Sequence, residues 1–198
     1  MAWVFLAPWS DTGCNAAMKI GILSDTHDRL PTFRRALQLF ARLEVDAVFH
    51  AGDLIAPFAA KLLTADADIL PPKLFPEHVH VIYGNNDGER DGLKKILPQI
   101  VDGPLRVTLD TPGCGSGTTT VAMAHFIDWF KPDDLAGADV VISGHDHTPS
   151  IQSRPDGDRD VLFINPGECC GWVNERCTVA LLDLSGPSPK ADLIDVKG

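Results

Sequence analysis

The sequence predicts a layered α/β fold. Short apolar runs alternate with helical patterns up to residue 97, and strand-like runs dominate from residue 105 onward. A chain of 198 residues with 44% hydrophobic residues is most simply one domain with a sizeable core. Because strand–helix units place helices on the faces of a sheet, the pattern predicts sheets covered by helices.

The first half of the chain holds the strand–helix units. Residues 31–43 predict a helix, since Phe33, Leu37 and Phe40 recur at the spacing of one helical face. The same reasoning predicts strands at 19–24, 46–50 and 78–83, helices at 57–64 and 89–97, and a proline-rich loop at 71–76.

The second half is predicted to be mainly β-structure. Strands are expected at 105–109, 119–125, 138–143, 150–154, 160–164, 177–183 and 191–195. The glycine-rich segment 112–117 predicts a hairpin connection between the first two of these strands.

The first seventeen residues differ from the rest of the chain. Residues 1–9 are apolar but lack a basic start and contain Pro8, so they make a poor signal peptide and are too short to span a bilayer. The first core strand begins directly after Met18. We therefore expect residues 1–17 to be a disordered extension or a mis-assigned start, and residues 18–198 to form the domain.

Charge and cysteine content narrow the function classes. The net charge of −10 argues against nucleic acid held by a basic surface, which needs Lys and Arg to neutralise phosphates. Five irregularly spaced cysteines predict reduced thiols in a cytoplasmic protein rather than a zinc finger. A redox role for the adjacent Cys169 and Cys170 stays open.

Four short segments and one lone histidine carry the potential metal ligands. Asp, Asn and His offer the oxygen and nitrogen donors that suit Zn, Mn, Fe or Ni. In an extended segment, residues i and i+2 face the same way, so a DxH or HxH segment presents paired donors. The candidates are Asp25, His27, Asp53, Asn85, His125, His145 and His147.

The spacing of these residues predicts that they meet. Asp25, Asp53 and Asn85 are separated by about the 30 residues of a strand–helix–strand unit. Such units return the chain to the same edge of a sheet, so ligands placed just after each strand gather at the carboxyl ends. Taken singly, the same residues would also suit ordinary structural roles. Asp25 and Asp53 suit helix N-caps, and the segment 84–88 suits a type I′ turn.

The order of the segments resembles the calcineurin-like metallophosphoesterases, whose pattern is DxH, GD, GNH/D, H, GHxH. The chain is most similar to the small bacterial and archaeal phosphodiesterases of that superfamily, from residue 19 onward, with Ile164–Gly167 also fitting. The resemblance implies an αββα sandwich of two mixed β-sheets flanked by helices.

The resemblance also implies a dinuclear metal centre. Asp25, His27 and His147 would hold one ion, Asn85, His125 and His145 would hold the other, and Asp53 would bridge both. The ions would be two divalent transition metals, Mn or Ni, with Zn or Fe as alternatives. Two such ions, about 3.5–4 Å apart, generate a hydroxide nucleophile near neutral pH and clamp the phosphoryl oxygens.

Two residues depart from the family pattern. Asn86 stands where many relatives carry the histidine that protonates the leaving group, and an amide cannot do this. The small phosphodiesterase branch often lacks that histidine, so we expect Asn86 to contact substrate instead. Phe126 follows His125 where glycine is common, and its ring would narrow the substrate cleft.

The sequence therefore predicts a cytoplasmic, metal-dependent phosphodiesterase that acts on small phosphate diesters. We expect no membrane partner, and a homo-oligomer stays open. The alternatives are a phosphomonoesterase on the same site and a non-catalytic scaffold of the retromer-subunit type. That subunit has altered several metal ligands, whereas this chain keeps all seven, which favours an enzyme.

Overall fold

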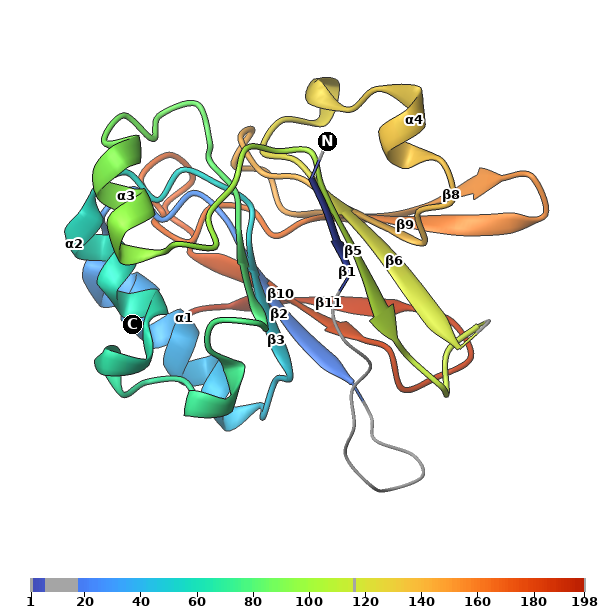
Figure 1. The fold of residues 1–198 in the computed structure, drawn as a ribbon, viewed down its shortest axis with the longest axis horizontal. Helices are drawn as coiled ribbons and strands as arrows, with labels where there is room; N and C mark the ends of the chain where they lie inside the picture. The colour runs from blue at the N-terminus through green and yellow to red at the C-terminus, as the bar shows by residue number, and fades with distance from the viewer. Residues whose placement is uncertain (1, 6–17, 116, 198) are drawn as a thin grey trace.

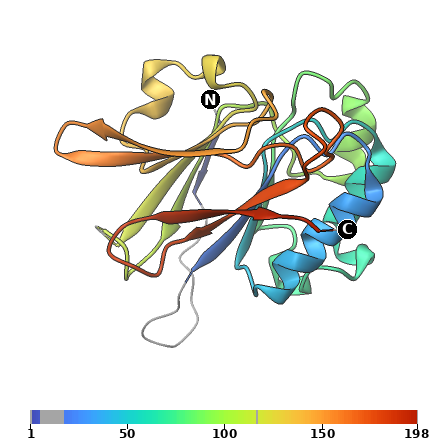
Figure 2. The same cartoon turned by 180° about the vertical axis from the view of Figure 1, so that it is seen from behind.

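The computed structural model describes residues 2–5, 18–115 and 117–197. Two mixed β-sheets pack face to face, and helices lie on the outer faces (Figures 1 and 2). The predicted αββα sandwich is confirmed. The helices gather mainly on one side of the molecule. There, α1 (Leu30–Arg42), α2 (Pro57–Ala60) and α3 (Arg90–Ile96) cover one sheet, while the other sheet carries little besides α4 (Pro132–Leu135).

The first sheet has five strands in the order β11-β10-β2-β3-β4. Strands β2, β3 and β4 run parallel to one another, and β10 pairs antiparallel with both β2 and β11. The parallel strands come from the strand–helix units predicted in the first half. The bounds are β2 Lys19–Leu23, β3 Ala47–His50, β4 Val79–Val81, β10 Thr178–Asp183 and β11 Lys190–Asp195.

The second sheet has six strands in the order β1-β5-β6-β7-β9-β8. Strands β6, β7 and β9 are parallel, while β5 and β8 pair antiparallel with β6 and β9. The bounds are β1 Ala2–Phe5, β5 Leu105–Asp110, β6 Thr118–Met123, β7 Val140–Ile142, β8 Ser150–Asp156 and β9 Arg159–Asn165. Strands β5 and β6, which the predicted hairpin connection joins, pair antiparallel, and residue 116 of that connection lies outside the described residues.

Alternate residues of the central strands fill the space between the sheets. Ile22 and Phe49 from the first sheet pack in one buried cluster with Val121, Met123 and Ile142 from the second. Side chains that alternate along each strand reach this layer from both sheets, as period-two packing requires. The shared core fixes the two sheets against each other and so aligns their strand ends.

Helices cover the outer face of the first sheet. Helix α1, Leu30–Arg42, buries Phe33, Leu37 and Phe40, the helical face that the sequence predicted. Phe40 packs against β2, where a Cβ on Gly21 would lie 2.6 Å from its ring. The predicted helix at 57–64 is short: α2, Pro57–Ala60, continues as a 3₁₀ turn, Lys61–Leu63. Helix α3 spans Arg90–Ile96.

Several short helical turns were not predicted. They are the 3₁₀ turns Ala65–Ala67, Pro72–Leu74 and Ile127–Trp129, and helix α4, Pro132–Leu135. A segment of four residues has no helical periodicity to detect. Helix α4 instead depends on a local contact, because the Asp134 carboxylate accepts a hydrogen bond from the Lys131 backbone N–H at 2.8 Å.

Part of the predicted N-terminal extension lies within the described residues. Residues 2–5 form β1, which pairs parallel with β5 from Ala2↔Leu105 to Phe5↔Thr108. Strand β1 therefore supplies hydrogen-bond partners to the backbone groups on this edge of β5, and no local sequence pattern predicts this pairing. Residues 6–17 of the predicted extension lie outside the described residues.

None of the helices in the described parts of the chain is long and apolar enough to cross a membrane.

Candidate metal centre

The predicted ligands lie at the carboxyl ends of parallel strands in both sheets. Asp25 and His27 follow β2, Asp53 follows β3, and Asn85 follows β4. In the second sheet, His125 follows β6, and His145 and His147 follow β7. The structure brings all seven side chains into one cluster. The spacing predicted this for Asp25, Asp53 and Asn85.

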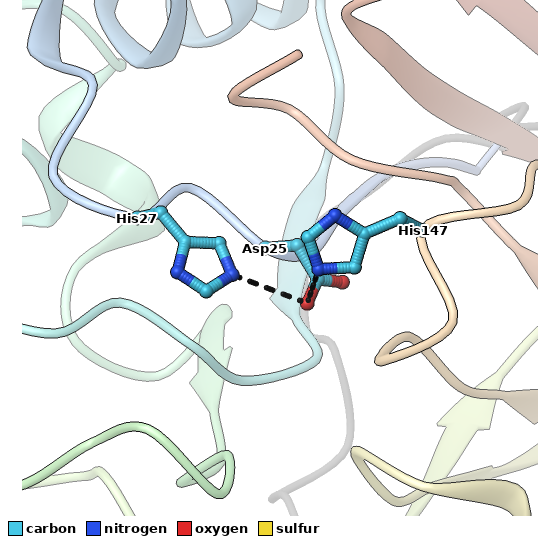
Figure 3. Close-up of side chains that lie close together, drawn as sticks. All are labelled: Asp25, His27 and His147. Atoms are coloured by element: carbon cyan, nitrogen blue, oxygen red, sulfur yellow. Dashed lines mark ion pairs between the residues drawn. The ribbon is translucent and has the colours of Figure 1, made fainter. Parts of the chain in front are cut away.

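One half of the cluster consists of Asp25, His27 and His147 (Figure 3). Asp25 is fully buried. Its Oδ1 atom lies 3.7 Å from His27 Nε2 and 3.4 Å from His147 Nε2. Its Oδ2 atom accepts a hydrogen bond from the His145 backbone N–H at 3.1 Å, which ties this half to the neighbouring ligand segment.

The other half consists of Asn85, His125 and His145. Asn85 Oδ1 lies 2.9 Å from both His125 Nε2 and His145 Nδ1. The His125 ring is fully buried, and its Nδ1 atom lies 2.7 Å from the Ala51 carbonyl oxygen. Because a carbonyl only accepts, Nδ1 of His125 is the donor, and a neutral ring then presents the lone pair of Nε2 to Asn85.

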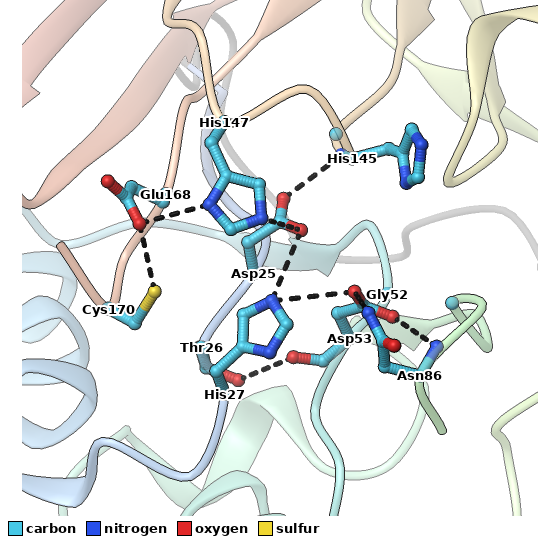
Figure 4. Close-up of polar contacts among 12 residues, drawn as sticks. Asp25, Thr26, His27, Gly52, Asp53, Asn86, His145, His147, Glu168 and Cys170 are labelled. Atoms are coloured by element: carbon cyan, nitrogen blue, oxygen red, sulfur yellow. Dashed lines mark hydrogen bonds and ion pairs between the residues drawn. The ribbon is translucent and has the colours of Figure 1, made fainter. Parts of the chain in front are cut away.

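Asp53 lies between the two halves. Its Oδ2 atom is 3.4 Å from His27 Nε2 and 3.4 Å from His125 Nε2. Asn86 holds it from the opposite side, since its backbone N–H donates to Oδ1 at 2.9 Å and its side-chain amide donates to Oδ2 at 2.7 Å (Figure 4). The Asn86 amide therefore orients the carboxylate that faces both halves.

The two ordinary structural roles that these residues could have, helix N-cap and type I′ turn, do not fit the structure. The residue at the N-cap of α1 is Arg29 and that of α2 is Ala56, so Asp25 and Asp53 cap neither helix. A type I′ turn at 84–88 would need positive φ at Asn85 and Asn86, and neither is among the positive-φ residues of the described chain.

The backbone at the site is unusual. Five of the seven candidates have positive φ, a conformation that costs side-chain-bearing residues free energy and clusters at functional sites: Asp25, His27, Asp53, His145 and His147. Motif glycines allow close approach. A Cβ on Gly84 would lie 2.1 Å from Asp53 Oδ1, and one on Gly144 would lie 2.8 Å from Asp25 Oδ2.

Three buried side chains support the cluster. Sequence reasoning missed Glu168, which follows β9 and accepts a hydrogen bond from His147 Nδ1 at 3.0 Å. It also missed Asp87, whose Oδ2 accepts from the Asp53 and Gly84 backbone N–H groups at 3.1 Å and 2.6 Å. The third is His50, whose Nε2 lies 3.1 Å from Thr26 Oγ1, next to Asp25.

The charges of the cluster favour cations. Burial alone would raise the pKa of Asp53, but the contact with His125 and the hydrogen bonds from Asn86 hold that pKa well below its usual range. The nearby carboxylate of Asp25 raises the pKa of His27. Burial lowers the pKa of His50 to about 4, which keeps that ring neutral. The cluster therefore stabilises positive charge between its carboxylates.

The donor atoms fit metal ions. Asp25 Oδ1 and His27 Nε2 are buried and lack a hydrogen-bond partner in the described chain. His147 donates from Nδ1, so a neutral ring points the lone pair of Nε2 at Asp25 Oδ1. Lone pairs that face each other in a buried cluster need a cation between them, and imidazole, carboxylate and amide oxygen suit a divalent transition metal.

Two further sequence features have a place beside the cluster. The Phe126 ring packs against the His145 ring with centroids 4.4 Å apart, so it borders the Asn85 half. Cys169 and Cys170 are buried free thiols near Asp25, since their backbone N–H groups donate to the carbonyls of Ser24 and Asp25. Burial raises the pKa of Cys170 to about 12, which disfavours the reactive thiolate.

The sequence model of the calcineurin-like phosphoesterase superfamily domain matches residues 18–186, the stretch that contains every candidate ligand. The chain belongs to this superfamily. Its members hydrolyse phosphoric esters with metal ions, so the predicted enzyme class is confirmed at that level.

Individual proteins similar to this chain belong to the same class of phosphoesterases. A phosphodiesterase of Methanocaldococcus jannaschii is 36% identical to this phosphoesterase over 173 residues, which cover 84% of this chain and 93% of that protein. A solved archaeal phosphodiesterase is 33% identical, with a TM-score of 0.67, over 89% of this chain and 100% of that one. An E. coli phosphoesterase structure, 20% identical with a TM-score of 0.61, covers 91% and 100% and supports the fold alone.

Proposed function

We propose that this phosphoesterase is a phosphodiesterase that hydrolyses small phosphate diesters with a dinuclear metal centre. The observation that carries the proposal is the convergence of two sets of donor atoms on either side of Asp53. The relative from Methanocaldococcus jannaschii, which is named a phosphodiesterase and matches most of this chain, supports diesters as the substrate class.

Each half of the cluster would hold one ion. Asp25, His27 and His147 would bind the first, Asn85, His125 and His145 would bind the second, and Asp53 would contact both. When bound, two such ions lower the pKa of a water molecule and withdraw charge from phosphoryl oxygens. The mixed nitrogen and oxygen donors suit Mn or Ni, with Zn or Fe as the alternatives.

The protein's own side chains would then shape the reaction. The carboxylates of Asp25 and Asp53 are held by backbone N–H groups of His145 and Asn86, so they are oriented before substrate arrives. The Asn86 amide donates to Asp53, and its N–H protons are too weakly acidic to protonate a departing oxygen. Diesters with acidic leaving groups are therefore the substrates that this site suits best.

Asn86 would also contact substrate. It is exposed at the cluster while its amide reaches the buried Asp53, so it borders both solvent and the proposed ions. A phosphate diester carries one negative charge, which matches a pocket where two carboxylates offset part of the charge of two dications. The protein as a whole is acidic and would repel an anionic substrate, so we propose that this limited positive charge attracts the diester locally.

Two alternatives share the same residues. A phosphomonoesterase would use the same ions on a dianionic substrate. A scaffold of the retromer-subunit type would bind partners on its surface and would not need seven converging donors. The packed and strained ligand segments favour an enzyme over a scaffold. A cytoplasmic location remains part of the proposal, and a homo-oligomer stays open.

The test is hydrolysis by metal-stripped protein reloaded with Mn, Ni, Zn or Mg. We expect a transition metal to restore activity when about two ions are bound per chain. The restored activity should be higher on the diester bis(p-nitrophenyl) phosphate than on the monoester p-nitrophenyl phosphate. Faster cleavage of the monoester would favour the phosphomonoesterase. Two bound ions with no hydrolysis of either compound would favour the scaffold.

A further inference from the structure

Glu168 lies behind one of the candidate metal ligands and is itself buried, with 1% of its surface exposed. Its Oε2 atom accepts a hydrogen bond from His147 Nδ1 at 3.0 Å (Figure 4). We propose that Glu168 is a positioning residue that fixes the His147 ring and thereby sets metal affinity in the Asp25 half alone. This inference rests on the proposed metal centre.

The hydrogen bonds around Glu168 decide which way the proton on His147 points. Oε2 also accepts from Cys170 Sγ at 3.1 Å and from the Trp172 and Val173 backbone N–H groups at 2.9 Å and 3.0 Å. Oε1 accepts from the backbone N–H groups of Val173 and Asn174. A carboxylate surrounded by backbone donors acts only as an acceptor, so His147 Nδ1 must be the donor.

The consequence lies on the other side of the ring. With the proton held on Nδ1, His147 Nε2 carries a lone pair that faces Asp25 Oδ1 at 3.4 Å. This is the tautomer that a metal ligand needs. A carboxylate behind a ligating histidine also makes the ring a stronger donor, and substituting such partners typically lowers metal affinity.

Glu168 also belongs to a segment that braces the same half. At the start of the segment, the backbone N–H groups of Cys169 and Cys170 donate to the carbonyls of Ser24 and Asp25 at 3.0 Å and 3.1 Å. At its end, Asn174 Nδ2 donates to the His147 carbonyl at 2.9 Å. Residues 168–174 therefore connect the two chain segments that supply Asp25 and His147.

The Asn85 half is supported differently. The second ring nitrogen of His125 is held by a backbone carbonyl, that of Ala51, at 2.7 Å. No side-chain substitution removes that acceptor. A change at Glu168 should therefore act on one half and spare the other, which distinguishes positioning from a general loss of stability.

A direct ligand role for Glu168 is the competing hypothesis. His147 Nδ1, a Glu168 oxygen and Cys170 Sγ lie within 4.8 Å of one another and form a possible metal-binding group. In the structure, however, the ring nitrogen and the thiol both donate to Glu168, and backbone N–H groups occupy the rest of the carboxylate. An ion there would have to displace these donors, so the geometry favours positioning.

The test is a calorimetric titration of metal-free Glu168→Gln protein with Mn²⁺. We expect one of the two binding steps to weaken by on the order of ten- to a hundredfold, with the other unchanged. The ¹⁵N spectrum of the metal-free variant should show His147 losing its preference for the proton on Nδ1. Asp134→Asn is the matched control, since Asp134 is a buried carboxylate that accepts a backbone N–H away from the centre.

Other outcomes separate the two proposals. If wild type binds two ions and Glu168→Gln binds both with unchanged affinity, the positioning role is wrong while the metal centre stands. Equal weakening of both steps, or a third ion bound by wild type and lost in the variant, also overturns it. If wild type binds no ion, the proposed function fails first. Should Glu168→Gln not fold, Glu168→Asp replaces it, with the same selective but smaller loss expected.

Discussion

The two halves of the candidate metal centre differ in charge and exposure. The Asp25 half contains a fully buried carboxylate, and a second buried carboxylate, Glu168, holds its His147 ring. The Asn85 half relies on a neutral amide oxygen that is exposed, and a backbone carbonyl holds its His125 ring. One half is thus anionic, with its carboxylate ligand buried, and the other is neutral, with its amide ligand at an exposed residue.

This difference indicates a division of labour within the proposed centre. Carboxylate ligands attract a dication more strongly than amide ligands do, above all where water is excluded. We therefore expect the Asp25 half to hold its ion more tightly and the Asn85 half to exchange its ion more readily. The neutral half also leaves more positive charge for a phosphate oxygen.

The largest effect is expected at the residue that the two halves share. Asp53→Ala should remove a ligand from both positions and lower diester hydrolysis by about a thousandfold or more, because metal ions supply several kcal/mol of transition-state stabilisation. Elemental analysis after reconstitution should show less bound metal than for any other single ligand variant. Asp66→Ala, at an exposed position of a surface turn, is the control. Equal metal content in wild type and Asp53→Ala would contradict the shared role.

The next effect concerns the leaving group. Asn86 lies at Asp53 and offers no acidic proton, so hydrolysis should depend steeply on the acidity of the leaving group. Asn86→His should raise the rate on alkyl esters by up to about a hundredfold and change the rate on activated aryl diesters much less.

The readout is the ratio of the two rates in wild type and variant, measured side by side. Asn86→Ala serves as the control, because it removes the hydrogen bond to Asp53 without adding an acid. If Asn86→His changes both substrate classes by the same factor, Asn86 only shapes the turn, and the proton-donor argument is wrong.

A smaller effect should come from giving both halves of the centre a carboxylate ligand of their own. Asn85→Asp adds a carboxylate to the neutral half, so the weaker Mn²⁺ binding step should tighten by about tenfold, while KM for a diester rises several-fold because the centre is less positive. Calorimetry and steady-state kinetics measure the two changes on the same preparation. Unchanged affinity together with unchanged KM would show that charge does not distinguish the halves.

Much of this centre could be predicted from the sequence because its parts are local. Each ligand segment stands directly after an apolar strand, so strand prediction and spacing together bring Asp25, Asp53 and Asn85 to one edge. Glu168 obeys the same rule, following the strand predicted at 160–164, but its partner His147 lies 21 residues earlier. Only the parallel pairing of β7 with β9 brings the two together.

Other features escaped prediction for related physical reasons. Helix α4 has four residues and depends on one carboxylate contact rather than on periodicity. Strand β1 forms through pairing with residues about a hundred positions away, at 105–108. Contacts of this kind are properties of the assembled sheet, and no window of neighbouring residues contains them.

The smallest effect is expected from a sheet edge that belongs to neither half of the centre. Strand β1 lies at the edge of the six-stranded sheet, beside β5, and supplies no candidate ligand. We propose that residues 18–198 fold without it. Deleting residues 1–17 should leave metal content and diester hydrolysis unchanged, while the lost pairing lowers the thermal midpoint by about 2–4 °C, or about 1 kcal/mol. A full-length variant with residues 2–5 replaced by Gly and Ser separates the loss of β1 pairing from shortening of the chain. A drop of well over 10 °C, or loss of metal binding, would mean that the extension supports both halves of the centre.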